Sequence, residues 1–219
     1  MSGHHQRRAA VPAAGGGGAL AYRSAATTNT SGSSSTSVTV NKPSGVVDGD
    51  FMVCAICLDN PSNGYTAPSG WTERQNSDLV HGGANGSVWT KQAGSSEPSS
   101  YTWTLTSGRK HAACIMATVG GTYDTIASTE DGSGSTTSTA PSATVAEDGS
   151  IVFRTAHIKG TSFTALPSGV TEVFNHDGDV LLWCGYEADV AAGASGTAQW
   201  TTADSKKYDT NTVVVGPST

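Results

Sequence analysis

The amino-acid sequence predicts an all-β protein, an antiparallel β-sandwich of jelly-roll type with an internal pseudo-repeat and an extended N-terminal arm. Short apolar runs are separated by Gly, Pro, Asn or Asp, and many of them alternate apolar and polar residues. Two parts of the chain also repeat one another. About a quarter of the residues are Ser or Thr and 27 are Gly, which disfavours helices and suits short strands joined by turns.

The N-terminal arm is predicted to span residues 1–37. Residues 1–19 end in a run of four glycines, and residues 26–37 form a low-complexity Ser/Thr stretch. The sequence ALAYRSA between them has the pattern of one short strand. Polar stretches of this kind bury too little apolar surface to fold alone. We therefore expect the arm to become ordered on a partner, and the β-sandwich body to span residues 38–219.

The body is predicted to be built from a series of short strands. Tyr101, Trp103 and Leu105 occupy alternate positions, as in a strand with one buried face. No stretch has the 3.6-residue period of a long amphipathic helix. In chain order the predicted strands are SVTV, FMVCAICL, SVWTKQ, SYTWTLT, HAACIMATV, IVFRTAHI, VTEVF, DVLLWCGYE, TAQWTT and NTVVV.

Two halves of the body, about 38–121 and 141–217, are predicted to be copies of one unit. PSGWTE recurs as PSGVTE, and an Asp-Gly pair precedes the first long run of each half. We favour one pseudo-symmetric sandwich over two small tandem ones, because each half alone would have a small core. The aligned pairs are Asp48 with Asp148, Pro68 with Pro167, Trp89 with Trp183, Gly94 with Gly193, and Trp103 with Trp200.

Charge is divided unevenly along the chain. Residues 1–47 contain four basic residues and no acid, whereas the remaining 8 basic and 18 acidic residues give −10. A basic arm on an acidic body suits docking to an acidic neighbour, including another copy of the chain. The basic residues are too sparse to indicate nucleic-acid binding. The candidate docking residues of the arm are Arg7, Arg8, Leu20, Tyr22 and Arg23.

No targeting or membrane segment is predicted. The N-terminal residues lack the apolar core of a secretory signal, and no stretch approaches the ~20 apolar residues that a spanning helix needs. We therefore expect synthesis in a cytoplasm, with any export occurring as part of an assembly. Free buried cysteines agree with a reducing cytoplasm during synthesis.

The chemically reactive residue types form no recognisable catalytic or metal-binding pattern. Cys54 and Cys57 lie three apart on a predicted strand, so they point to opposite faces and are expected to be buried free thiols. The sequences DGD at 48–50 and 177–179 are interpreted as turns rather than calcium loops. The histidines lack the spacing of a metal site, and no nucleophile motif is present. No catalytic residue, cofactor or metal is therefore predicted.

The tryptophans are interpreted mainly as core anchors, since three of them recur across the repeat or lie at alternating strand positions. Trp71 is the exception, because it follows a turn and is replaced by Val170 in the second copy. Together with Tyr65 it is the best candidate for an exposed pair that stacks on a sugar ring.

The string of turn and strand motifs resembles a β-sandwich family common in bacteriophage virion proteins, whose members are described as minor tail, head-decoration or head-fibre components. The resemblance covers about residues 36–121 well and 141–217 weakly. The second copy departs from the pattern at Val170 and lacks the Glu-Pro pair. The residues that carry the resemblance are Pro43, Gly45, Gly49, Asp50, Pro68, Gly70, Trp71, Ala93, Gly94, Glu97, Pro98, Tyr101 and Trp103.

This resemblance implies a non-enzymatic structural protein of a virus particle. We expect a capsid decoration protein anchored by its arm, with a minor tail or head-fibre protein as the alternative. The expected partners are major capsid or tail subunits and other copies of the chain. A carbohydrate-binding adhesion module that recognises a host-surface glycan is an alternative of another class. A hydrolase is disfavoured, since the sequence shows no recognisable catalytic nucleophile, carboxylate pair or set of metal ligands.

Overall fold

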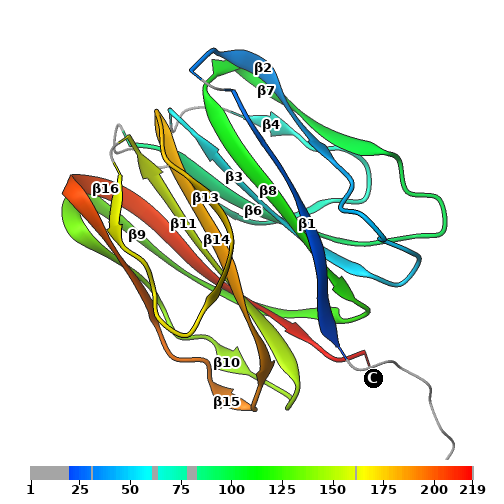
Figure 1. Ribbon diagram of the computed structural model, residues 1–219. Coiled ribbons are helices and arrows are strands. Elements are labelled where there is room, and N and C mark those ends of the chain that lie inside the picture. Colours follow the sequence, from blue (N-terminus) through cyan, green and yellow to red (C-terminus); the bar gives the residue numbers. More distant parts are fainter. Residues whose placement is uncertain (1–19, 31, 61–63, 78–82, 161, 219) are drawn as a thin grey trace, which may run out of the picture.

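The computed structural model describes residues 20–30, 32–60, 64–77, 83–160 and 162–218, and in these ranges every regular element is a β-strand (Figure 1). This confirms the predicted all-β, sandwich-like fold. In chain order the strands are β1 (Ala21–Asn29), β2 (Ser35–Asn41), β3 (Phe51–Leu58), β4 (Tyr65–Thr66), β5 (Thr72–Asn76), β6 (Asn85–Gln92), β7 (Ser100–Arg109), β8 (His111–Val119), β9 (Thr122–Ala140), β10 (Thr144–Val145), β11 (Ser150–Lys159), β12 (Phe163–Ala165), β13 (Thr171–His176), β14 (Val180–Val190), β15 (Gly193–Ala194) and β16 (Ala198–Gly216).

Two large antiparallel sheets form the centre of the molecule. Sheet I has the strand order β1-β8-β3-β6-β5, and sheet II has the order β9-β16-β11-β14-β13, with β12 also paired to β16. A smaller sheet, β2-β7-β4, covers the outer face of sheet I. Figure 1 shows the layers side by side, with β2, β7 and β4 on one flank and β9 and β16 on the other.

The two halves of the chain have the same strand order. In the second half, β9 and β16 are each 19 residues long and each contributes to two layers, where the first half uses separate strands. Residues 122–131 of β9 pair with residues 208–216 of β16 as β1 pairs with β8. Residues 137–140 of β9 pair with residues 198–201 of β16 as β2 pairs with β7. The second copy therefore begins at β9, not near residue 141. Its Ser/Thr-rich sequence has no apolar alternation to mark it.

The repeat also places equivalent tryptophans in equivalent contacts. The rings of Trp89 and Trp103 lie 6.4 Å apart in the first half, and those of Trp183 and Trp200 lie 5.3 Å apart in the second. All four are buried. The interpretation of these residues as core anchors is confirmed.

Sheet I is buried on both faces. Met52, Cys54 and Ile56 of β3 pack towards the smaller sheet, while Phe51 and Val53 pack towards sheet II. A strand enclosed in this way has no wet face, which is why FMVCAICL is a continuous apolar run instead of an alternating one. The body is thus neither one sandwich shared by the halves nor two separate ones, because each half has its own core and the halves share another.

Part of the predicted arm, residues 1–37, belongs to the body in the structure. β1 is hydrogen-bonded to β8 along its length, and β2 pairs with β7, so residues 20–30 and 32–37 belong to the body. Backbone pairing and partial burial hold this polar edge strand, although its Ser/Thr-rich sequence lacks a run of large apolar residues. Arg7 and Arg8 lie outside the described residues.

Candidate functional site

The Gly49-Asp50 motif forms a buried turn cap. The Asp50 side chain is 2% exposed, and its Oδ2 accepts a hydrogen bond from the Val47 N–H at 2.8 Å. The guanidinium of Arg23 on β1 contacts both carboxylate oxygens, with Nε 2.7 Å from Oδ2 and Nη2 2.9 Å from Oδ1. The turn that starts β3 is therefore tied to the N-terminal strand.

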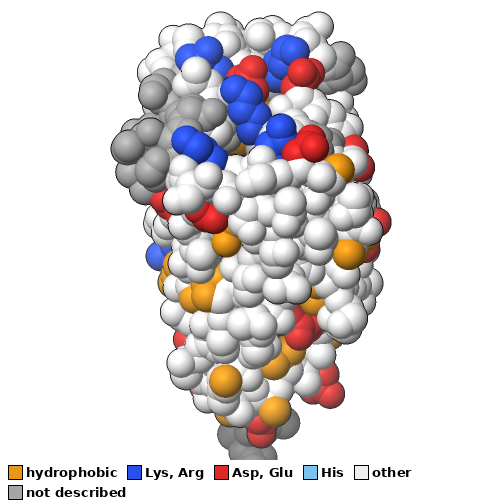
Figure 2. All heavy atoms as spheres, turned by 90° about the vertical axis from the view of Figure 1, so that its left-hand side faces the viewer, with side chains coloured by type: hydrophobic (Ala, Val, Ile, Leu, Met, Phe, Trp, Pro, Cys, Tyr) orange, Lys and Arg blue, Asp and Glu red, His pale blue; other side chains and the backbone are white. Residues whose placement is uncertain are grey.

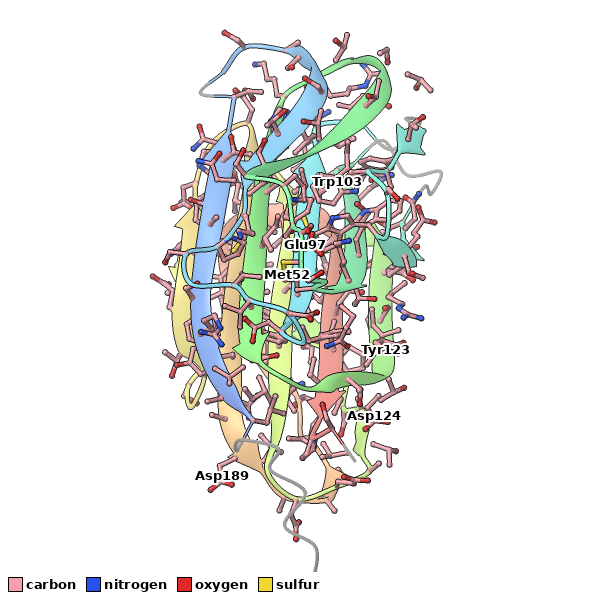
Figure 3. All side chains as sticks on the ribbon, turned by 90° about the vertical axis from the view of Figure 1, so that its right-hand side faces the viewer. Met52, Glu97, Trp103, Tyr123, Asp124 and Asp189 are labelled. Carbon is pink, nitrogen blue, oxygen red and sulfur yellow. The ribbon has the colours of Figure 1, made fainter. Side chains whose placement is uncertain are left out.

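The Ala-Gly-x-x-Glu-Pro motif closes the hairpin between β6 and β7. Glu97 Oε1 accepts the Gly94 N–H at 2.8 Å, and its Oε2 accepts the Tyr101 hydroxyl at 2.7 Å. Lys91 Nζ lies 3.2 Å from Oε1. Figure 3 shows Glu97 between Met52 and Trp103 in the first half of the body. Desolvation opposes ionisation of Glu97, but these hydrogen bonds and Lys91 outweigh it, so the pKa of the carboxyl lies below its usual value.

Replacing Glu97 with glutamine is expected to lower the free energy of unfolding by about 1–2 kcal/mol at pH 7, because three donors then lose their charged acceptor. A carboxyl with a lowered pKa stabilises the fold above its unfolded pKa and loses this effect as pH falls. The difference between wild type and Glu97→Gln should therefore shrink below pH ~4.5. Urea unfolding at several pH values measures it. Glu73→Gln, at an exposed residue, is the control and should change the free energy of unfolding at pH 7 by less than about 0.5 kcal/mol.

Tyr65 and Trp71, the predicted sugar-stacking pair, are used inside the body. Trp71 is 8% exposed and its ring lies 5.1 Å from those of both Tyr101 and Trp103. The Tyr65 hydroxyl donates to Asn85 Oδ1 at 2.7 Å. The expected exposure of Trp71 is wrong, because the turn before β5 directs the indole inward onto the first-half core.

The described members of the predicted docking set also contact the body itself. Leu20 packs against the core between the large sheets, and the ring of Tyr22 stacks on Tyr186 of β14 at 4.2 Å. Arg23 is held by Asp50. These residues fix β1 across both halves, and this contact within the body was not foreseen from the sequence.

The interior of the body contains titratable groups that solvent does not reach. Cys54, Cys57, Cys114 and Cys184 are free and buried, as predicted. Burial raises the pKa values of the Cys54, Cys57 and Cys184 thiols. His157 Nδ1 lies 3.1 Å from Asp209 Oδ2, and both side chains are at most 2% exposed. Among the described residues, no group of three or more His, Cys, Asp or Glu side chains is arranged to hold a metal ion.

One end of the body carries an open hollow of about 660 Å³, here called the lysine hollow, at the tip of the β9–β16 pair. Figure 2 shows Lys and Arg side chains gathered at this end, with acidic side chains between them, above a surface that is largely uncharged. The residues that line the lysine hollow are Gly83, Ser133, Gly134, Lys159, Gly160, Gly178, Asp179, Ser205, Lys206 and Lys207.

The opposite end carries a second hollow, of about 520 Å³, where the two Asp-Gly turns of the repeat meet. Leu20, Val47, Asp48, Asp148 and Asp189 contribute to its wall, and Val47 is 56% exposed. Figure 3 shows Asp189 and Asp124 towards this end. β11 runs from one hollow to the other, which at about 3.3 Å per residue separates them by roughly 30 Å.

A third hollow lies beside the lysine hollow and contains His111 and His176. Burial lowers the pKa of each imidazole. At His111 this is opposed by a hydrogen bond that the ring donates to the Arg109 backbone, and at His176 by the negative charges of Asp177 and Asp179. Both rings are therefore biased towards the neutral form in the folded protein.

The strands and their order define an all-β, sandwich-like protein with a duplicated unit. No family model, curated protein or solved structure matches the chain. No helix with the length and hydropathy to cross a membrane occurs in the described ranges.

Proposed function

We propose that the chain is a non-enzymatic structural subunit of a bacteriophage particle, a capsid decoration protein that residues 1–19 fasten to neighbouring subunits. The strongest support comes from the structural roles of the residues that resemble the virion family. Asp50, Trp71, Glu97 and Trp103 carry the resemblance to the virion β-sandwich family, and each serves as a turn cap or core anchor. A body built in this way offers a rigid surface for contacts with other subunits.

The position of Leu20 supports attachment through the preceding residues. Leu20 lines the hollow whose wall includes Asp48, Asp148 and Asp189. Residues 1–19 contain Arg7 and Arg8 and no acid. A basic segment that leaves from an acidic end suits docking on the acidic end of another copy or on a similarly charged capsid subunit.

Deleting residues 1–19 is expected to leave the unfolding temperature nearly unchanged and to abolish incorporation into particles. The deletion leaves every described strand intact, since β1 begins at Ala21. Incorporation is measured by quantifying the protein in purified particles after complementation of a null mutant. Normal incorporation of the truncated protein contradicts the proposal.

Deleting residues 1–29 provides the structural comparison. This longer deletion removes β1, which leaves the edge of β8 unpaired and removes the contact between Tyr22 and Tyr186. It should lower the unfolding temperature markedly. The double variant Arg7→Gln/Arg8→Gln tests charge alone and should reduce incorporation with no change in stability.

A further inference from the structure

We propose that the lysine hollow binds a phosphate ester carried on a sugar. This inference is independent of the proposed structural role, because it concerns the end of the body remote from Leu20. Lys159, Lys206 and Lys207 line one hollow together with the hydroxyl-bearing residues Ser133 and Ser205. Ammonium and hydroxyl donors together match the oxygens of a dianionic phosphate.

Basic residues outnumber acidic ones among the residues that line the lysine hollow. Three lysines and one acid line it, and that acid, Asp179, is paired with Lys110 at 2.9 Å. Asp131 Oδ1 accepts the N–H groups of Ser133 and Gly134 and thereby closes its own turn. Asp204 lies 4.0 Å from Lys206 in an exposed pair, which water screens strongly.

The shape of the hollow suits a group larger than a bare ion. Four glycines in its lining bring backbone close to the space, and Lys207 packs against one of them, with its Cβ 3.2 Å from where a Cβ on Gly83 would lie. The volume of about 660 Å³ lies in the range of small-molecule sites. Gly83 comes from the first half and the remaining lining residues from the second, so both halves contribute to the wall of the hollow.

The lining favours a sugar phosphate over a nucleic acid. No aromatic side chain belongs to it, so the stacking platform that single-stranded nucleic acids need is missing from the described lining. A phosphorylated sugar needs only donors for its phosphate and hydroxyl groups. The same chemistry occurs in a free sugar phosphate and in a phosphate-bearing glycan of a cell surface.

Calorimetric titration of the full chain with glucose 6-phosphate, glucose and inorganic phosphate tests the proposal. At low salt, glucose 6-phosphate is expected to bind with a millimolar Kd and glucose not at all. The variant Lys159→Gln/Lys206→Gln should weaken binding by about tenfold or more, since two of the three ammonium groups are lost. Lys42→Gln, which removes a charge in the first half, is the matched control and should bind as wild type does.

A phosphate-bearing polysaccharide that binds more tightly than glucose 6-phosphate indicates a surface glycan as the source, and equal affinity indicates the free sugar phosphate. The proposal is overturned if glucose 6-phosphate gives no heat up to about 10 mM, a limit of about 2.7 kcal/mol in affinity. It is also overturned if the double variant, with an unfolding temperature equal to that of wild type, retains full affinity.

Discussion

Replacing Arg154 with methionine is expected to destabilise the fold by about 3–5 kcal/mol, because it removes one partner of a buried ion pair. Arg154 is 1% exposed on β11, and its Nε contacts Glu187 Oε1 at 2.7 Å. Its terminal nitrogens donate to Thr212 Oγ1 at 2.7 Å, the Ser195 carbonyl at 2.7 Å and the Gly196 carbonyl at 3.1 Å. Methionine fills the space but leaves these acceptors without a donor.

Urea unfolding followed by tryptophan fluorescence measures this effect. Arg154→Lys keeps the charge but lacks the planar fork, so it should recover only part of the loss. Arg74→Met is the matched control, because Arg74 is only half-buried, with its guanidinium 3.8 Å from the Tyr123 ring and its Nε donating to Thr90 Oγ1 at 2.7 Å. It should cost at most about 1 kcal/mol. An unchanged midpoint for Arg154→Met would show that the buried network does not stabilise the second half.

Replacing Gly86 with alanine is expected to cost about 3 kcal/mol or more, because β6 passes directly over the His157–Asp209 pair. A Cβ on Gly86 would lie 2.3 Å from Asp209 Oδ2 and 2.7 Å from His157 Cγ. Both partners are buried, and Asn211 Nδ2 also donates to Asp209 Oδ2 at 3.1 Å. The clash therefore cannot be relieved by turning one flexible side chain into solvent.

Gly216→Ala provides the comparison, since a Cβ at this position meets no heavy atom within 4 Å. It should change the unfolding free energy by less than about 1 kcal/mol. Thermal unfolding of both variants, read by circular dichroism, gives the difference. Equal unfolding temperatures would mean that the two large sheets are not packed as closely as β6 and β11 indicate.

Many strands were predictable from the sequence because their side chains carry the signal. FMVCAICL is apolar throughout and became β3, HAACIMATV is mostly apolar and became β8, and the run SYTWTLT became part of β7. The repeat predicted two units of one design, and both halves show the same strand order. β9 was missed, since its sequence is largely polar and its long backbone pairing with β16 places it in the sheet.

The candidate sites were less predictable, because they depend on residues far apart in the chain. Nothing near Trp71 in the sequence reveals that its indole turns inward to meet Tyr101 and Trp103. The three lysines of the lysine hollow come from the end of β11 and from β16. They carry no motif, and only a charge count over the folded surface would find them.

The sequence by itself determined the all-β class, the duplicated unit and the burial of the cysteines, because periodicity and turn residues act locally. Tertiary structure decided that sheet I is enclosed on both faces, that β1 belongs to the body, and that Arg154 is satisfied inside it. The physical reason is that a side chain's burial and partners depend on which layer packs above it. In this chain, the packing of one copy of the unit against the other supplies that layer.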